Sequence, residues 1–145
     1  MVGLDLGARR IGVAVSDSAG SLAMARCTLS RSGDDAADRR QVVALVMEAG
    51  ASLLVVGLPL SLDGSHGPAA RDALGEAAAL RELFEPHGIG VETFDERFTT
   101  ASAERQLAGA GHRGPSRRRR VDETAAAVIL QAWLDTRRER EGRER

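Results

Sequence analysis

The amino-acid sequence predicts an α/β domain with a mixed sheet of about five strands flanked by helices. Three apolar segments separated by glycine-containing breaks come first, a pattern typical of an antiparallel meander. Helical and strand patterns then alternate, as they do where helices join parallel strands. A chain of 145 residues can bury a core of its own, and this one shows no internal repeat or linker. We therefore predict one domain over residues 1–138.

The first half of the chain supplies the meander and one helix. The three strands are predicted at residues 2–6, 9–17 and 21–30. A helical pattern follows Asp34 and Asp35 and continues to Glu48, with apolar residues spaced along one face. Gly50 fits the end of that helix, because glycine readily adopts the conformation that terminates helices.

The second half alternates strands and helices. The continuous apolar run SLLVVGLP predicts a strand at residues 52–59 that is buried on both faces. The remaining elements are expected as a helix at 67–86, a strand at 88–96, a helix at 100–110 and a helix at 121–138. The tail at 139–145 contains only charged residues and glycine, and it is predicted to be disordered.

Charge is unevenly distributed along the chain. The formal net charge is −1, and all 20 basic residues are arginine. Arg117, Arg118, Arg119 and Arg120 form an unbroken run just before the last predicted helix. Four cations beside the positive end of a helix repel one another and the helix dipole, so local stability does not explain them. A phosphate backbone would offset this repulsion, which favours an anion-binding role over a merely solvated charged segment.

The sequence favours a reducing compartment and no membrane. Cys27 is the only cysteine, which excludes an internal disulfide, and its apolar neighbours indicate a buried thiol. The first residues enter a strand without a signal-peptide pattern. No apolar run reaches the ~20 residues needed to cross a bilayer. We therefore predict a cytoplasmic protein.

Asp5 stands among apolar neighbours in the first strand, within VGLDLGARRIGVAVSD at residues 2–17. Burying a carboxylate costs stability unless backbone amides, a charged partner or a cation compensate it. Backbone amides at the strand end and a bound metal ion are both compatible with this position. The residues themselves leave these two interpretations open.

Two more carboxylates stand at the end of a predicted strand, in FDERFTT at residues 94–100. Open α/β sheets usually build their sites at the carboxyl ends of strands. Asp95 and Glu96 are both candidates. Strand alternation does not choose between them, because either face of this strand can be buried.

Other candidate residues have an equally good structural explanation. Asp122 and Glu123 begin the final helix, where acidic residues also favour the helix dipole. Ser65 lies in the glycine-rich loop LSLDGSHGP, where it fits either phosphate binding at backbone amides or capping of the next helix. The three histidines show no zinc-like spacing.

Four stretches together resemble one family, the YqgF/RuvX-type Holliday junction resolvases, also described as pre-16S ribosomal RNA nucleases, of the RNase H-like superfamily. These stretches are GLDLGARRIGVAVSD, VVGLPLSLDGSHGPAA, DERFTT and RRRRVDETAAAVILQAWLD. Their order and spacing extend over about residues 2–135, nearly the whole chain. The first stretch alone also resembles the opening of actin-like ATPases and sugar kinases, so the specificity comes from the series of four.

The resemblance implies an RNase H-like fold and a metal-dependent phosphodiesterase, with acidic site residues at Asp5, Glu96 and Asp122. It thereby selects Glu96 over Asp95, and it makes Arg97 a substrate contact or a structural contact. We expect two Mg²⁺ or Mn²⁺ ions, about 3.5–4 Å apart. Asp5 would bridge these ions, and the other two carboxylates would each hold one side.

The expected partner is nucleic acid, bound through its phosphates with little readout of the bases. Arg9 and Arg10 could equally cap a turn on the far side of the sheet. The predicted nucleic-acid-binding residues are Arg9, Arg10, Ser65, Arg97, Arg117, Arg118, Arg119 and Arg120.

Precursor ribosomal RNA and branched DNA both fit the implied activity. A junction resolvase would act as a homodimer that makes paired nicks, whereas an RNA-processing nuclease could act as a monomer. A non-catalytic nucleic-acid-binding module of the same fold is an alternative, but the three acidic positions argue against it. An actin-like nucleotide-binding protein is another, but 145 residues leave no room for a second lobe.

Overall fold

The computed structural model describes residues 1–97, 99 and 115–144, with side chains from residue 124 onward in the last of these ranges. These residues form a five-stranded sheet in the order β3-β2-β1-β4-β5. The strands are β1 (Val2–Leu6), β2 (Arg10–Ser16), β3 (Ala23–Ser30), β4 (Leu53–Leu58) and β5 (Gly90–Asp95). The first three pair antiparallel, β4 is parallel to β1, and β5 is parallel to β4. The predicted mixed sheet with its meander is confirmed.

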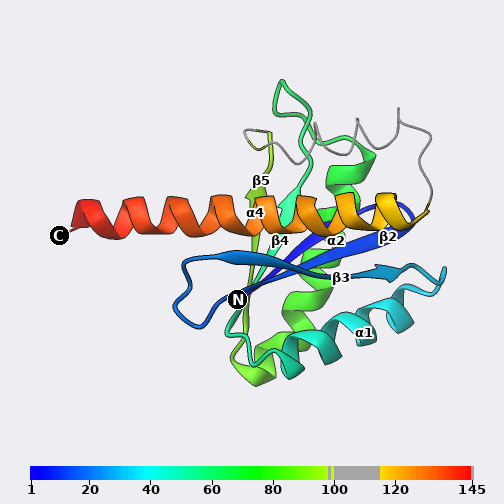
Figure 1. Cartoon of the computed structure of the whole chain (residues 1–145). Helices are drawn as coiled ribbons and strands as arrows, with labels where there is room; N and C mark the ends of the chain where they lie inside the picture. The colour runs from blue at the N-terminus through cyan, green and yellow to red at the C-terminus, as the bar shows by residue number, and fades with distance from the viewer. Residues whose placement is uncertain (98, 100–114, 145) are drawn as a thin grey trace.

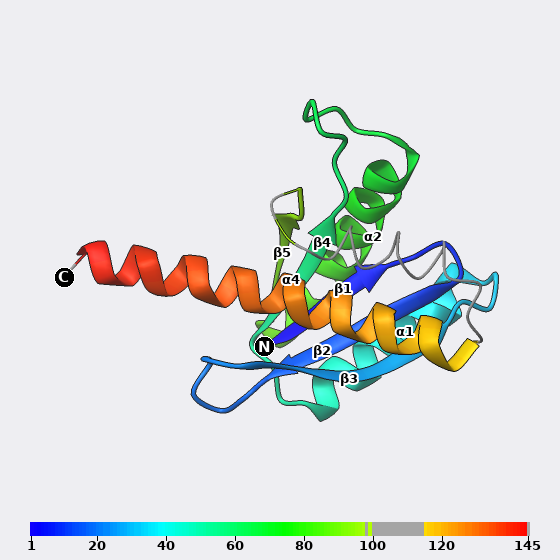
Figure 2. The same ribbon diagram turned by 45° about the horizontal axis from the view of Figure 1, so that its top comes forward.

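Helices cover both faces of this sheet (Figures 1 and 2). One face carries α1 (Asp35–Glu48) and α2 (Pro68–Phe84), and α2 continues into the short 3-10 turn η1 (Glu85–His87). The other face is crossed by α4 (Pro115–Glu144). The helix predicted at 100–110 lies outside the described residues.

Alternation along the strands divides the apolar side chains between two cores. In β1, Val2 and Leu4 pack with residues of α1 and α2, whereas Gly3 faces α4. A Cβ added at Gly3 would lie 2.8 Å from Cβ of Leu130, so the absence of a side chain lets α4 lie close on the sheet. The helix buries a row of apolar side chains there, namely Ala125, Ala126, Ile129, Leu130 and Leu134.

The last helix begins earlier than the sequence predicts. The predicted start is residue 121, but α4 begins at Pro115. Proline suits the first turn of a helix, because its nitrogen needs no hydrogen-bond partner there and its φ angle is already helical. Arg117–Arg120 therefore belong to the helix rather than to the loop before it.

The same helix also ends later than the sequence predicts. It continues to Glu144, which corrects the predicted end at residue 138 and the predicted disorder of residues 139–144. Arginine and glutamate are good helix formers, and Arg137 pairs with Glu141 one turn later at 2.9 Å. These residues carry the helix beyond the edge of the sheet (Figure 1).

Candidate functional site

Asp5 lies near the end of β1, with only 3% of its surface exposed. Because Gly3 faces α4, alternation places Asp5 on the same face of the sheet. On the neighbouring strand β2 it pairs with Gly12, which adds no side chain beside the carboxylate. The central strand therefore presents a buried carboxylate on the face that α4 crosses.

Glu96 directly follows β5 and is 1% exposed. Its backbone N–H donates to the carbonyl oxygen of Leu58 at 3.2 Å, which extends the pairing of β4 and β5. Phe94 packs with the residues under α4, so alternation places Glu96 on that face too. Its Oε2 lies 2.6 Å from where a Cβ on Gly57 would stand, so the glycine makes space for the carboxylate.

Asp95 lies on the opposite face and has a different role. Val91 of the same strand packs in the core beneath α1 and α2, and Asp95 shares its face. The carboxylate forms an ion pair with Arg97 at 2.7 Å, with 31% of the Asp95 side chain exposed. The Arg97 guanidinium lowers the pKa of Asp95 chiefly through this hydrogen bonding. The two adjacent carboxylates thus point to different sides of the sheet.

Asp5 and Glu96 flank β4 on the α4 face. The sheet order places β4 between β1 and β5. Leu4 of β1 pairs with Val56 of β4, and this parallel register brings Asp5 beside Gly57, against which Glu96 lies. Two buried carboxylates therefore stand on either side of one glycine, at the carboxyl ends of the strands.

This pair of carboxylates suits a divalent cation. Two buried negative charges on one face repel each other, and a cation compensates both. Oxygen ligands of this kind favour Mg²⁺ and Mn²⁺ over softer metals. Among the described residues there is no cluster of three or more side chains that could hold a metal ion. The third predicted ligand, Asp122, has its side chain outside the described part of α4.

The backbone of α4 shows where position 122 lies along the helix. It stands one turn before Ala126, whose side chain is buried and whose carbonyl oxygen is 3.2 Å from a Cβ placed on Gly3. The helix therefore passes over β1, the strand that carries Asp5.

Two of the predicted phosphate-binding arginines lie at the same end of the sheet. Arg9 and Arg10 follow β1 in the turn to β2, where the N–H of Gly7 donates to the carbonyl oxygen of Arg10 at 2.9 Å. Arg9 is exposed and Arg10 is half-buried. This is the end where Asp5 lies, not the far end of the sheet. The predicted arginine run, Arg117–Arg120, occupies the first turns of α4, with side chains outside the description.

Ser65 is exposed in the loop between β4 and α2, but it does not cap that helix. The residue before the first turn of α2 is Gly67, which has no capping side chain. Ser65 instead closes a turn within the loop, where its N–H donates to Oδ1 of Asp63 at 2.9 Å. The capping interpretation of Ser65 is therefore wrong.

Gly57 is a site residue that the sequence analysis missed. The apolar run SLLVVGLP predicts a buried strand but gives the glycine within it no separate role. A glycine inside a strand often marks a close approach of another group, and that signal was present. Two groups approach Gly57 in this way. A Cβ added to Gly57 would lie 2.6 Å from Oε2 of Glu96 and 2.7 Å from Cδ1 of Ile129.

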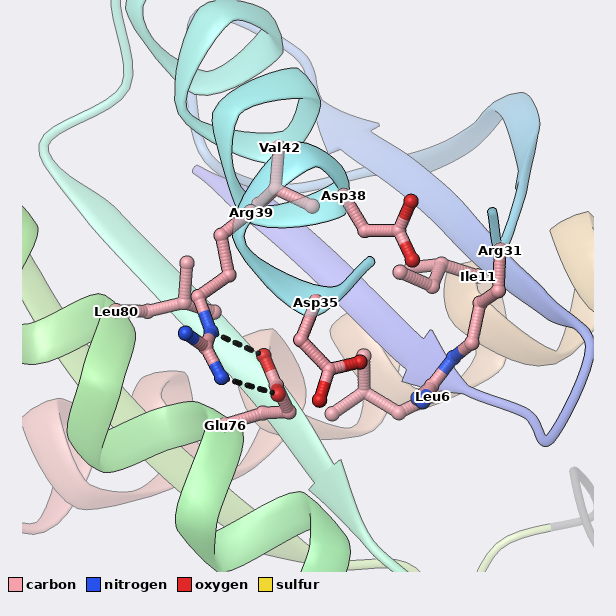
Figure 3. A pocket seen from close by; sticks show the side chains of 9 residues that line it. All are labelled: Leu6, Ile11, Arg31, Asp35, Asp38, Arg39, Val42, Glu76 and Leu80. Atoms are coloured by element: carbon pink, nitrogen blue, oxygen red, sulfur yellow. Dashed lines mark hydrogen bonds and ion pairs between the residues drawn. The ribbon is translucent and has the colours of Figure 1, made fainter. Parts of the chain in front are cut away.

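Charged side chains, one of them the buried Asp38, also cluster on the other face, where the structure explains them. Figure 3 shows the cluster between α1, α2 and the ends of β1 and β2. Arg39 donates from Nε and Nη2 to the two carboxylate oxygens of Glu76, both at 2.9 Å, and so joins α1 to α2. Asp38 accepts hydrogen bonds from the backbone N–H and the hydroxyl of Ser32. These carboxylates hold helices and a loop in place.

Solved structures with the same fold are junction resolvases. The structure of T. thermophilus RuvC in complex with a Holliday junction substrate matches with a TM-score of 0.58 at 14% identity, covering 94% of this chain and 95% of that one. The yeast mitochondrial Holliday junction resolvase Ydc2 matches with a TM-score of 0.51 at 9% identity, covering 92% and 76%. The chain thus has the RNase H-like fold that these RuvC structures share.

Sequence relatives define the family within this class. The chain belongs to the RuvX family, described as Holliday junction resolvase, which it matches over residues 1–136. A relative from Mycobacterium sp. (strain KMS) is 44% identical over 137 residues, covering 94% of this chain and 80% of the relative. Another from Anaeromyxobacter dehalogenans is 43% identical over 136 residues, covering 94% and 96%. Both are named for pre-16S rRNA nuclease activity, and the predicted membership in a nuclease family is confirmed.

Within residues 1–97 and 115–144, no helix is both long enough and apolar enough to cross a bilayer.

Proposed function

We propose that this chain is a divalent-metal-dependent nuclease that processes precursor 16S ribosomal RNA. The observation that supports the site is the pair of buried carboxylates, Asp5 and Glu96, on either side of Gly57. The relatives support RNA as the substrate, because those at 43% and 44% identity carry the name of that activity.

Asp5, Glu96 and Asp122 would hold the metal. Divalent cations held there, two in the arrangement we propose, would supply the charge that activates water and stabilises the departing oxygen. Asp5 would contribute its carboxylate from the central strand. Glu96 is held at the end of β5 by its backbone bond to Leu58. Gly57 keeps the space between these carboxylates free of a side chain.

The arginines at this end of the molecule would bind the phosphate backbone. Arg9 lies in the turn after β1, Arg10 begins β2, and Arg117–Arg120 occupy the first turns of α4. Contacts of this kind position a strand without reading its sequence. Affinity for nucleic acid should therefore fall steeply as salt concentration rises.

Branched DNA is the second candidate substrate, because the matched family is described as Holliday junction resolvase. Paired cuts in a four-way junction require two sites related by a two-fold axis, so this activity would need a homodimer. Processing of precursor RNA needs one site. We infer a cytoplasmic location from the proposed RNA substrate.

The test is a cleavage panel with Mg²⁺ or Mn²⁺ on precursor 16S rRNA, four-way junctions, and single- and double-stranded DNA. The wild-type protein should cleave the precursor RNA. Asp5→Asn and Glu96→Gln should each lower the rate by about 10²–10³-fold, the scale expected for a group that supports transition-state charge. The control Asp72→Asn changes an exposed carboxylate of α2 that pairs with Arg31, and it should leave the rate unchanged.

Two results would change this conclusion. Wild-type cleavage by Asp5→Asn in saturating Mn²⁺ would contradict the proposed metal site. Preferential cleavage of the four-way junction would select the second substrate, and the protein should then sediment as a dimer.

A further inference from the structure

Arg97 directs its guanidinium toward a near neighbour in the sequence, Asp95, and toward a distant residue, Leu62. Its Nε donates to both oxygens of Asp95, at 3.1 and 2.9 Å, and Nη2 donates to Oδ2 at 2.7 Å. Its Nη1 donates to the carbonyl oxygen of Leu62 at 3.4 Å. Arg97 therefore connects the end of β5 to the loop between β4 and α2.

That loop, residues 59–67, is held in shape by hydrogen bonds within its own backbone. The N–H of Ser61 donates to the carbonyl oxygen of Ser65 at 3.1 Å, and the N–H of Gly64 donates to that of Ser61 at 2.8 Å. Gly64 has a φ of +85°, and a Cβ there would lie 3.2 Å from Nη1 of Arg97. The Arg97 guanidinium thus packs directly against the turn.

The loop rises past the carboxyl ends of β4 and β5 (Figures 1 and 2). Its residue Leu62 is 93% exposed, the largest value among the large apolar side chains described. Exposing a leucine to this degree gives no folding benefit, because its apolar surface remains in water. A contact with substrate would explain it.

We propose that Arg97 is a positioning residue: together with Asp95 it fixes the loop at residues 59–67 at the carboxyl ends of β4 and β5, so that Leu62 contacts the nucleic acid. The inference rests on the proposed nuclease function. Of the two roles predicted for Arg97, a substrate contact or a structural contact, it selects the structural one, because the pair with Asp95 uses the bidentate geometry that a phosphate would need.

The electrostatics of the pair agree with this arrangement. The hydrogen bonds to Asp95, followed by its charge, raise the pKa of Arg97 above its usual value. The nearby Arg97 charge also contributes to a lowered pKa of Asp63 in the loop, after the larger effect of the hydrogen bonds from Ser65. The arginine is therefore balanced by carboxylates on both elements that it joins.

The first experiment measures the loop directly by hydrogen exchange of the full chain. Arg97→Gln and Asp95→Asn should each speed exchange of the backbone amides of Ser61, Gly64 and Ser65, and exchange in α1 should not change. The matched control Asp72→Asn breaks another arginine–aspartate ion pair, with Arg31, and should leave the loop unaffected. Unchanged loop exchange in both variants would overturn the positioning role, whether or not the protein cleaves RNA.

The second experiment separates positioning from phosphate binding. With Arg97 as a positioning residue, Arg97→Gln, Asp95→Asn and the double variant should lose a similar factor in kcat/KM, about tenfold to a hundredfold, without additivity. Arg97→Lys should lose as much, because one ammonium cannot bond both Asp95 and the Leu62 carbonyl. The salt dependence of affinity should stay unchanged.

A direct phosphate contact predicts different results. Arg97→Lys would then retain activity, Asp95→Asn would not lower it, and Arg97→Gln would reduce the slope of log affinity against log salt by about 1. Any of these would overturn the proposal. Absence of cleavage by the wild-type protein would instead contradict the nuclease assignment, and the exchange result would still decide the role of Arg97.

The Leu62 contact is tested by Leu62→Ala, with Leu83→Ala as the control at another exposed leucine, 46% exposed on α2. Leu62→Ala should raise KM severalfold. The double variant with Arg97→Gln should have the same KM as Arg97→Gln alone. The control should match the wild type. An unchanged KM for Leu62→Ala would overturn the assigned contact.

Discussion

Gly57 is the single residue on which the arrangement of the two carboxylates depends most directly. Gly57→Ala would place a Cβ 2.6 Å from Oε2 of Glu96 and 2.7 Å from Cδ1 of Ile129. We expect a loss of about 1–3 kcal/mol in the free energy of unfolding, because both neighbours are buried and cannot move freely. Cleavage should fall as well, since Glu96 must shift. Urea denaturation and the cleavage assay measure the two effects.

The control for that substitution is Gly75→Ala in α2. This glycine is exposed, and nothing lies within 4 Å of an added Cβ. Alanine is the better helix former, so stability should rise by up to about 1 kcal/mol with cleavage unchanged. Equal stability of Gly57→Ala and wild type would show that the site tolerates a side chain at position 57.

At the residue scale, the sequence made Asp5 a candidate but could not separate Asp95 from Glu96. Asp5 stood out because a carboxylate among apolar strand residues needs compensation. Neighbouring strand residues face opposite sides, so one of Asp95 and Glu96 had to lie on each face. The face that carries the candidate site is the one on which α4 packs. The packing of α4 is a property of the tertiary structure, which local sequence does not show. Only the family resemblance favoured Glu96.

At the scale of single elements, the cap of α1 offers a clear test. Asp34 accepts hydrogen bonds from the N–H groups of Ala36 and Ala37, at 3.1 and 3.3 Å. Asp34→Ala should lower the free energy of unfolding by about 1 kcal/mol, because two amides of the first turn lose their partner. Asp34→Asn keeps an oxygen acceptor and should restore most of that stability in thermal or urea unfolding. A full loss in Asp34→Asn would show that charge, not capping, stabilises the helix.

The boundaries of α4 show where local patterns failed. A proline followed by an arginine run is typical of a loop, and a tail without apolar residues is typical of disorder. Both segments are helical because the centre of α4 is fixed on the sheet by buried residues such as Ala126 and Ile129. Once that nucleus exists, each further helical residue adds a hydrogen bond at little cost. Local composition could not supply this information.

At the scale of the whole molecule, the sequence predicted the architecture better than the site. Apolar alternation and glycine breaks were enough for the meander, and the run at residues 52–59 indicated a strand buried on both faces. The meeting of Asp5 with Glu96 required the order β1-β4-β5 and the parallel register between them. Register sets which carboxylates are neighbours, and it is determined by packing across the full sheet.

Carboxylates at opposite ends of this sheet make the stability of the whole molecule sensitive to acid. The pKa of Asp95 is lowered chiefly by hydrogen bonds from Arg97, and that of Asp17 chiefly by the backbone N–H of Ser21 in the turn before β3. For each group the folded pKa lies below its usual value of 3.8. Both groups therefore stabilise the fold fully above that value, and this stabilisation is lost as the pH falls through the folded pKa.

We expect the free energy of unfolding to decline below about pH 4 and the decline to be shallower in Asp95→Asn and in Asp17→Asn. The two groups are far apart, so the double variant should combine both changes additively. Urea denaturation at a series of pH values measures these slopes. A double variant with the wild-type slope would contradict this prediction. It would show that other carboxylates control the acid response, and that Asp95 and Asp17 bind as many protons in the folded state as in the unfolded state.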